Sequence, residues 1–446
     1  MAWSRISAVV VLVAGSGVAA ADGGVELRER PEAGQVSRVV VELKARGRLQ
    51  PGPAGGVGRR EEKPLGVHVE ARFAFVERVL ESRPGGHRRV ARWVVQAAAA
   101  RNGEVIPEES AIRPEVRLLV AEVREGAAHA YSPGGPLTRS ELELVQGPAD
   151  PLCLGGLLPG GTVAIGGRWK VGTDAARSLS GYDALAANGL SATLEALDDA
   201  TAKVRLHGEV RGAVLGGEGT IVCDGSFRFD RMAGQIDRLD LERSELRKPG
   251  AVEAGLDLTS TLSLERRPAE APAELADAVV AALPSRPDPG LELLRFTPVG
   301  GRYTLLHDRN WHIFSETTKQ AVLRWLDHGE VLAQCNLAAG PNAGRGRHQD
   351  LGQFRDDVRT ALGRSFGRVV GQGDVEGAAA GGFRHKVAVA GRVGETGVLW
   401  LYYLVASPAG DQLLATFTLT DAQARRFADQ DIRVIGSLEW KEPAAP

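Results

Sequence analysis

The sequence predicts two domains: an all-β domain with a curled antiparallel sheet, then an α+β domain in which helices cover an antiparallel sheet. Three observations predict this fold class. With 446 residues, 43% of them hydrophobic, the chain exceeds the size of one typical domain. Apolar and polar residues alternate through the first part, where no strong helix is expected before residue 270. After residue 290, strand and helix patterns follow each other along the chain.

Residues 1–21 predict a signal peptide, which would be removed from the exported protein. A basic start, the apolar run from Ile6 to Val13 and the small residues Ala19 to Ala21 match the parts of an export signal. We therefore expect a periplasmic or extracellular location. The apolar run is too short to cross a membrane and no comparable run follows, so we expect no membrane span in the mature chain.

Residues 25–266 predict the antiparallel β domain. The segment from Val67 to Phe75 places apolar side chains at every second position, which is typical of a sheet with one face on a core or a cavity. A helical turn or two is expected at residues 180–188. The other strands are expected at residues 39–45, 89–97, 116–123, 141–145, 190–197, 202–210, 221–229 and 256–264.

Residues 267–290 are rich in Pro and Ala and predict a linker, and residues 291–441 predict the second domain. In that domain, residues 351–366 place apolar side chains on one stripe at helical spacing. Asp350 precedes the stripe as its N-cap. We therefore expect one helix inserted between two sets of strands.

The most regular pattern of the chain lies at residues 383–440. Two alternating segments enclose a nearly continuous apolar run, which predicts three strands. Thr420 and Gln423 then form a capping box, the signature of a helix start. We expect one closing helix that lays Phe427 and Ile432 on the sheet.

Four features of the second domain match a known family. They are Tyr303 to Leu306 leading to Trp311, a hairpin ending at Ala333 to Asn336, the helix at residues 351–366, and the block FTLTDAQARRFADQDIRVIGSLEW. With them the domain resembles the PsbP-type extrinsic proteins of photosystem II and their bacterial relatives, over about a third of the chain. The resemblance implies the fold. It implies neither activity nor ligand residues, because the relatives are mostly binding or assembly modules.

The first domain also has a resemblance, carried by Leu158 to Val171, by the hairpin around His207 to Val210, and by Gly225 to Asp230. With these pieces it is similar to a class of exported, uncharacterised bacterial β-proteins. That class implies no reaction.

The bulk composition excludes some partners. A formal charge of −2 gives no field that would attract nucleic acid, so no nucleic-acid partner is expected. The cysteines Cys153, Cys223 and Cys335 leave two alternatives, a bridge between Cys153 and Cys223 or three buried thiols. We favour the thiols. The standard catalytic and nucleotide-binding motifs are absent from the sequence, so we expect no cofactor and lean against an enzyme.

His307, Asp308 and His312 are the weak candidates for a metal site, and with a carboxylate they are also the candidate site of a hydrolase. Two strand residues five positions apart point to opposite faces, so a turn between His307 and His312 is needed for both to bind one metal ion. The alternative, which we favour, is that these histidines are solvated or hydrogen-bonded in the core.

Arg345, Arg347 and His348 are the candidate ligand residues of a second site. Two arginines in a glycine-containing loop before a helix start are suited to a phosphate or carboxylate. Asp350 would compete for the same amide groups as the helix cap. A solvated loop is therefore the alternative.

A third candidate is the apolar face of the first domain. If the sheet curls and its hollow is not filled, aromatic side chains would line a lipid-sized cavity. The alternative is a filled core. The aromatic residues concerned are Phe73, Phe75, Trp93, Phe227 and Phe229.

From these patterns we expect an exported, non-catalytic binding or interaction protein of the cell envelope, whose partner is an unknown envelope protein or an apolar small molecule. A first alternative is a carrier of an apolar, lipid-like ligand in the β domain. A second alternative is a hydrolase whose site is assembled from residues distant in sequence.

Overall fold

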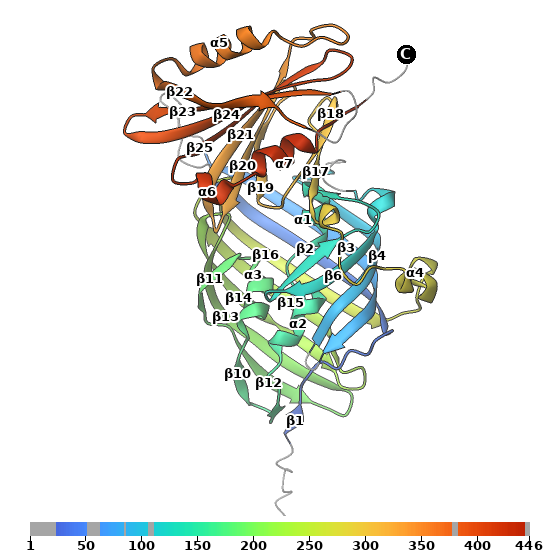
Figure 1. The fold of residues 1–446 in the computed structure, drawn as a ribbon. Helices are drawn as coiled ribbons and strands as arrows, with labels where there is room; N and C mark the ends of the chain where they lie inside the picture. The colour runs from blue at the N-terminus through green and yellow to red at the C-terminus, as the bar shows by residue number, and fades with distance from the viewer. Residues whose placement is uncertain (1–23, 51–62, 84–85, 106–110, 377–381, 442–446) are drawn as a thin grey trace, which may run out of the picture.

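The computed structural model describes residues 24–50, 63–83, 86–105, 111–376 and 382–441. The predicted signal peptide, residues 1–21, lies outside the described residues. Strands dominate the described chain: they form one large sheet in the N-terminal part, a smaller sheet in the C-terminal part and two minor sheets (Figure 1). The prediction of antiparallel sheets is confirmed.

Thirteen strands of the described chain form the N-terminal sheet, which is strongly curled (Figure 1). One run of neighbours extends from β2 through β3, β4 and β6 to β7, and another from β16 through β15, β14, β13 and β12 to β10. The two runs join where β2 pairs with β16, with Leu43 opposite Leu262. The strands are β2 (Val36–Gln50), β3 (Leu65–Arg83), β4 (Gly86–Arg101), β5 (Glu104–Val105), β6 (Leu118–Arg124), β7 (Ala127–Tyr131), β10 (Arg168–Lys170), β11 (Ala184–Asn188), β12 (Ser191–Leu197), β13 (Thr201–Val214), β14 (Gly217–Asp230), β15 (Gln235–Arg247) and β16 (Gly255–Pro268).

Short helices lie on the concave face of this sheet (Figure 1). Leu154, Leu157 and Leu179 from these helices are buried in one cluster with Phe227 and other apolar side chains of the sheet. The main N-terminal core therefore lies between the helices and the concave face. The elements are α1 (Arg139–Val145), α2 (Pro151–Leu154), η2 (Gly155–Leu157) and α3 (Thr173–Ser180), with η1 (Pro114–Val116), β1 (Val25–Glu26) and β9 (Thr162–Val163) beside them.

Two local predictions in this part were wrong. Residues 141–145, predicted as a strand, belong to α1, because Thr138 and Glu141 form a capping box. The Glu141 amide donates to Thr138 Oγ1 at 3.1 Å and the Thr138 amide donates to Glu141 Oε2 at 2.8 Å. Five residues are too few to separate helical from strand periodicity. The helical turn predicted at residues 180–188 is absent from that position, because α3 ends before Gly181 and β11 follows.

Seven strands of the described chain form the C-terminal antiparallel sheet, in the order β19, β20, β21, β25, β24, β23 and β22. The helix α5 (Leu351–Leu362) packs on one face through Phe354 and Val358. The helices α6 (Ala424–Phe427) and α7 (Gln430–Gly436) pack on the other face (Figure 1). The strands are β19 (Trp311–Glu316), β20 (Gln320–Asp327), β21 (Glu330–Gly340), β22 (Phe366–Asp374), β23 (Phe383–Val393), β24 (Thr396–Ala406) and β25 (Gln412–Thr420), and η5 (Gly363–Ser365) follows α5.

The predicted fold class was wrong. We expected a C-terminal α+β domain of PsbP-like fold with its sheet covered by helices, whereas the whole described chain is dominated by strands. The expected closing helix is two helices of four and seven residues, because the chain breaks at Ala428 with a φ of 51°. Ile432, expected against the sheet, is 44% exposed. The short helices thus supply only a few buried side chains to each face.

A small four-stranded sheet connects the two parts of the chain. Its strands are β8 (Leu137–Thr138), β17 (Leu294–Phe296), β18 (Tyr303–His307) and β26 (Glu439–Trp440). β8 comes from the N-terminal part and pairs in parallel with β17. The segment between the two parts contains η3 (Ala273–Leu275), α4 (Asp277–Ala281) and η4 (Pro289–Glu292), and Leu275 is fully buried against β3 and β4.

Five charged side chains form a buried ion cluster inside the N-terminal part. Arg92 donates both Nη groups to the carboxylate of Asp150 at 2.7 and 2.6 Å, and its Nε to Glu77 at 2.8 Å. Arg266 donates to Glu29 at 3.1 Å and to Glu77 at 3.5 Å. Burial alone would lower the pKa of Arg92, but the facing carboxylates outweigh it and raise this pKa. The cluster joins β3, β4 and β16 to α2 and to the N-terminal segment.

The substitution Arg92→Met should lower the free energy of unfolding by about 3 kcal/mol or more, because it leaves Asp150 buried without its cation and leaves Glu77 with Arg266 alone. Urea titration followed by tryptophan fluorescence measures this change. The matched control is Arg205→Met, which removes a half-exposed ion pair with Asp224 and should cost less than about 1 kcal/mol. Equal losses in the two variants would show that the buried cluster does not stabilise the fold.

Candidate ligand cleft

The residues predicted as metal candidates lie at the start of the C-terminal part. His307 ends β18, His312 lies in β19, and Asp308 starts the turn between them. The Asp308 carboxylate accepts from the Asn310 amide at 2.9 Å and from the Trp325 indole at 3.1 Å, so it stabilises the turn and the indole. His307 Nδ1 lies 2.7 Å from the carbonyl oxygen of Asp308. In the part of the chain that the structure describes, no three His, Cys, Asp or Glu side chains gather as metal ligands do.

The surroundings of both imidazole rings lower their pKa values. Burial, together with the nearby Arg139 cation, lowers the pKa of His307 to about 4 and that of His312 to about 3. The two rings are therefore neutral at pH 7. The hydrolase hypothesis required these rings and a carboxylate in one cleft, and His307, Asp308 and His312 do not line either of the two hollows described below.

The candidate ligand residues Arg345, Arg347 and His348 lie in an exposed loop before α5. The loop is tied by backbone hydrogen bonds to the turn between β24 and β25. The His348 ring stacks on Phe383, with centroids 3.7 Å apart. Asp350 accepts from an amide in the first turn of α5 at 2.9 Å, so the predicted competitor for an anion occupies this helix end.

The five aromatic residues predicted to line a cavity have different environments. Phe75, Phe227 and Phe229 are at most 3% exposed and fill the core. Trp93 lies on the opposite face of the sheet, in a cluster with the segment that joins the two parts. Arg92 precedes it and two valines, Val94 and Val95, follow it, so alternation did not decide its face. Only Phe73 is half-buried and borders an open space.

That space is a cleft of about 330 Å³ between α1 and the concave face of the sheet, called the apolar cleft below. Its volume lies at the lower end of the range typical of small-molecule sites, about 300–1,000 Å³. Strands β2, β3, β4 and β16 form the floor, and α1 with the residues after it forms the wall. The floor residues are Val41, Leu43, Ala71, Arg72, Phe73, Ala98, Ala99, Arg101 and Leu262, and the wall residues are Ser140, Glu143, Leu144, Gly147 and Pro148.

The cleft stays open because α1 is short and packs elsewhere. Leu142 and Val145 of α1 are buried in a separate cluster with apolar residues of β4 and β6. Leu144 packs at the margin of that cluster, is only partly buried, and also lines the cleft. Opposite it, Val41 and Leu43 are only half-buried at the margin of the main core. A helix of seven residues cannot cover this part of the concave face.

The border of the cleft is polar and carries both charges. Arg101 and Glu143 contribute side chains of opposite charge, and Ser140 adds a hydroxyl group. The guanidinium of Arg72 pairs with Glu42. A ligand would therefore meet an apolar floor and a border with hydrogen-bond donors and acceptors.

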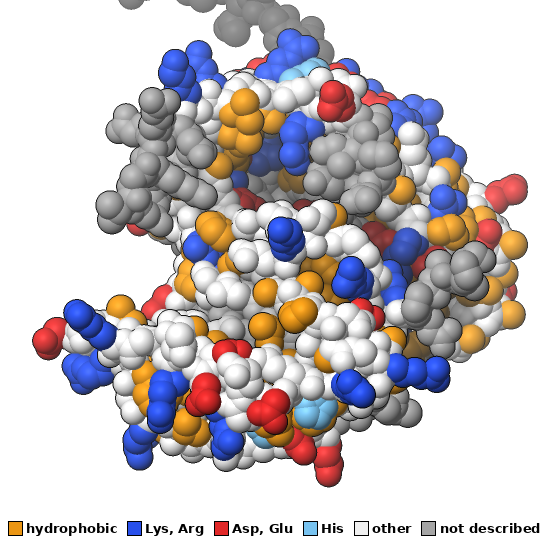
Figure 2. All heavy atoms as spheres, turned by 90° about the horizontal axis from the view of Figure 1, so that it is seen from above, with side chains coloured by type: hydrophobic (Ala, Val, Ile, Leu, Met, Phe, Trp, Pro, Cys, Tyr) orange, Lys and Arg blue, Asp and Glu red, His pale blue; other side chains and the backbone are white. Residues whose placement is uncertain are grey.

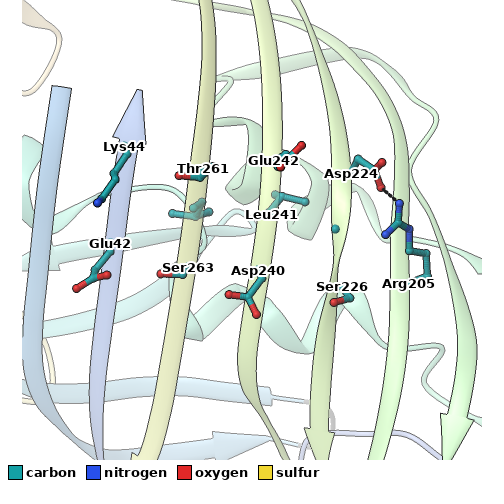
Figure 3. A pocket seen from close by; sticks show the side chains of 12 residues that line it. Glu42, Lys44, Arg205, Asp224, Ser226, Asp240, Leu241, Glu242, Thr261 and Ser263 are labelled. Carbon is teal, nitrogen blue, oxygen red and sulfur yellow. Dashed lines mark hydrogen bonds and ion pairs between the residues drawn. The ribbon is translucent and has the colours of Figure 1, made fainter. Parts of the chain in front are cut away.

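A second hollow, of about 480 Å³, lies on the opposite face of the same sheet. Figure 3 shows its two rows of polar side chains, which come from β2, β16, β15, β14 and β13. Asp224 pairs with Arg205 within these rows. The side chains are short or charged, and the backbone around Leu241 forms the floor. This groove therefore offers solvated polar contacts and little apolar surface.

The outer surface at the C-terminal end carries positive and negative charges side by side. In Figure 2, Lys and Arg side chains are interspersed with Asp and Glu. None of the helices in the described residues is long and apolar enough for a membrane span.

Comparisons with known proteins do not show a family. No family model and no curated protein matches the chain. Among solved structures, a Bacteroides thetaiotaomicron protein is 12% identical over 34% of this chain, with a TM-score of 0.25. The chain spans only 49% of the length of that protein. The translocator domain of the autotransporter NalP from Neisseria meningitidis is 9% identical over 87% of this chain and 88% of its own, with a TM-score of 0.11.

A mutant porin of Rh. blastica is similarly distant, at 9% identity over 86% of this chain and 99% of its own, with a TM-score of 0.13. These TM-scores are all below 0.5, so the likenesses carry no argument about fold or function. The resemblances stated from sequence to exported proteins stay predictions.

The three cysteines are free and buried, so Cys153 and Cys223 are not bridged and the favoured alternative is confirmed. Burial raises the pKa of Cys153 to about 12 and that of Cys223 to about 11. Both thiols are therefore protonated at neutral pH and are poor nucleophiles.

Sequence reasoning missed the wall of the cleft and the ion cluster. The wall was missed because residues 141–145 were predicted as a strand. The cluster had a signal that was available: Glu77, Arg92 and Arg266 each stand at an apolar-face position of their strands. Charges at such positions indicate a buried ionic contact, because an unpaired charge there would be very costly.

His307 should make the protein less stable in mild acid. Its folded pKa of about 4 lies below the unfolded value of about 6.5, so unfolding takes up a proton when the pH falls below 6.5. Between pH 7 and pH 5 this removes about 2 kcal/mol from the free energy of unfolding. His307→Gln should lose that much less over the same interval, measured by urea titrations at both pH values.

The control for this experiment is His207→Gln, because the His207 side chain is 59% exposed. It should show the same loss between pH 7 and pH 5 as the unsubstituted protein. If His307→Gln also shows an unchanged loss, His307 is not the buried neutral group described above.

Proposed function

We propose that this protein is an exported, non-catalytic binding protein that shelters an apolar small molecule in the apolar cleft. The observation that carries the proposal is the half-buried apolar floor formed by Val41, Leu43 and Phe73, which faces Leu144 across an open space. The export signal predicted at residues 1–21 supports a place in the cell envelope.

The chemistry of the cleft favours an elongated apolar molecule with a polar end. Apolar side chains from β2, β3, β4 and β16 give the floor, and burial of a hydrocarbon chain there is favourable by about 25 cal/mol per Å². Arg101, Glu143 and Ser140 lie at the border, where a polar end would keep its hydrogen bonds. A lipid-like amphiphile matches both features.

The hydrophobic fluorescent probe N-phenyl-1-naphthylamine should bind to the full chain, and Leu43→Gln should weaken this binding about tenfold. The substitution places an amide on the cleft floor, where an incoming apolar ring would desolvate it at a cost of about 1–3 kcal/mol. Fluorescence titration gives the dissociation constants.

The matched control is Leu65→Gln on β3, because Leu65 is 62% exposed and lies outside the cleft. Its dissociation constant should equal that of the unsubstituted protein. Native mass spectrometry of protein purified from its own cells provides an independent test. Copurification of a lipid-like molecule supports the proposal, whereas equal probe binding by both variants contradicts it.

A further inference from the structure

Helix α1 contacts both parts of the chain. Ser140 and Leu144 form part of the wall of the apolar cleft. On its other side, Leu142 and Val145 are buried in one cluster with Leu294 of β17, which belongs to the C-terminal part. The wall of the cleft is therefore supported from behind by the C-terminal part.

Hydrogen bonds fix the beginning of α1 to the C-terminal part. Arg139, the first residue of α1, donates from Nη2 to the carbonyl oxygens of Arg309 at 2.5 Å and of Trp311 at 2.7 Å. Just before it, Thr138 of β8 lies opposite Arg295 of β17 in a parallel pair. A charged donor bound to two backbone carbonyls holds the position of the helix start.

The end of α1 is held mainly by the apolar contacts of Val145 and has weaker hydrogen bonds than the beginning. Gln146 donates from its side chain to the carbonyl oxygen of Ala128 at 3.4 Å, and the exposed residue Gly147 follows at the border of the cleft. Within the N-terminal part, the main tie of the helix is Glu141, which accepts from Arg113 Nε at 2.8 Å. A shift of the C-terminal part would therefore move α1 about its first turn and change the width of the cleft.

Reciprocal contacts hold the same junction from the other direction. Arg309 donates from Nη2 to the carbonyl oxygen of Ala130 in β7 at 2.6 Å. Glu292, next to β17, pairs with Arg124 of β6. Both partners lie on strands near α1, so one part of the junction surrounds the helix; a second contact, from Arg324 of β20 to the carbonyl oxygen of Ala251, lies between β15 and β16.

We propose that the C-terminal part regulates the apolar cleft through α1, with Arg139 as the positioning residue that connects them. This inference rests on the proposed ligand-binding function. A ligand that fills the cleft presses α1 into its present position and so stabilises the contact between the two parts. Linkage requires the reverse effect to be equal, so loosening that contact weakens ligand binding.

The test is hydrogen–deuterium exchange of the full chain, with Arg139→Gln as the variant. Loss of two charge-assisted hydrogen bonds should speed exchange in the peptide covering residues 139–147 about tenfold. In the unsubstituted protein, saturating N-phenyl-1-naphthylamine should slow exchange in residues 294–307, and Arg139→Gln should abolish this slowing.

Arg177→Gln is the matched control, because Arg177 on α3 also donates to a backbone carbonyl but only within the N-terminal part. It should leave exchange of residues 139–147 unchanged. Unchanged exchange of these residues in Arg139→Gln overturns the inference. The inference is also overturned if probe binding depends on Leu43 but does not slow hydrogen exchange in residues 294–307. If probe binding does not depend on Leu43, the proposed function fails, whereas the exchange of residues 139–147 still decides whether Arg139 positions α1.

Discussion

The pairing of β2 with β16 is the contact on which the N-terminal part depends. These strands come from the two ends of that part, and each belongs to a run of neighbours built largely from local hairpins. Their pairing makes one curled sheet from two runs and places Leu43 beside Leu262 on the concave face. Joining distant segments costs loop-closure entropy, which burial of the concave face must offset.

The buried ion cluster lies across this junction. Arg266 comes from β16, Glu77 from β3 and Glu29 from the segment that precedes β2. Such ions lose much of their solvation energy, so they contribute less to stability than apolar packing of the same volume. They specify the strand register more strictly than apolar contacts do, because another register would leave a charge unpaired in the core. We interpret the cluster as a constraint on how the two runs of strands can join.

The apolar cleft follows from the same geometry. The curl of the sheet creates more concave surface than α1, α2 and α3 cover, and α1 is fixed at its beginning by Arg139 and Glu141. The exposed remainder is apolar on the floor and polar at the border. A small-molecule site can thus arise at the margin of a core, where a curled sheet extends beyond the helices that cover it.

The sequence by itself determined the strands, because alternation over eight or more residues, as from Val67 to Phe75, has a single physical interpretation. It also determined the helix start at Asp350, where a local side chain satisfies a local amide. The helix at residues 141–145 had a local signal, the Thr138–Glu141 capping box. Only the tertiary structure decided that the closing helix breaks at Ala428 and that Trp93 and Phe73 lie on opposite faces. The physical reason is range: periodicity and capping act between neighbours in sequence, whereas the curl, the junction of β2 with β16 and the cleft depend on contacts between distant segments.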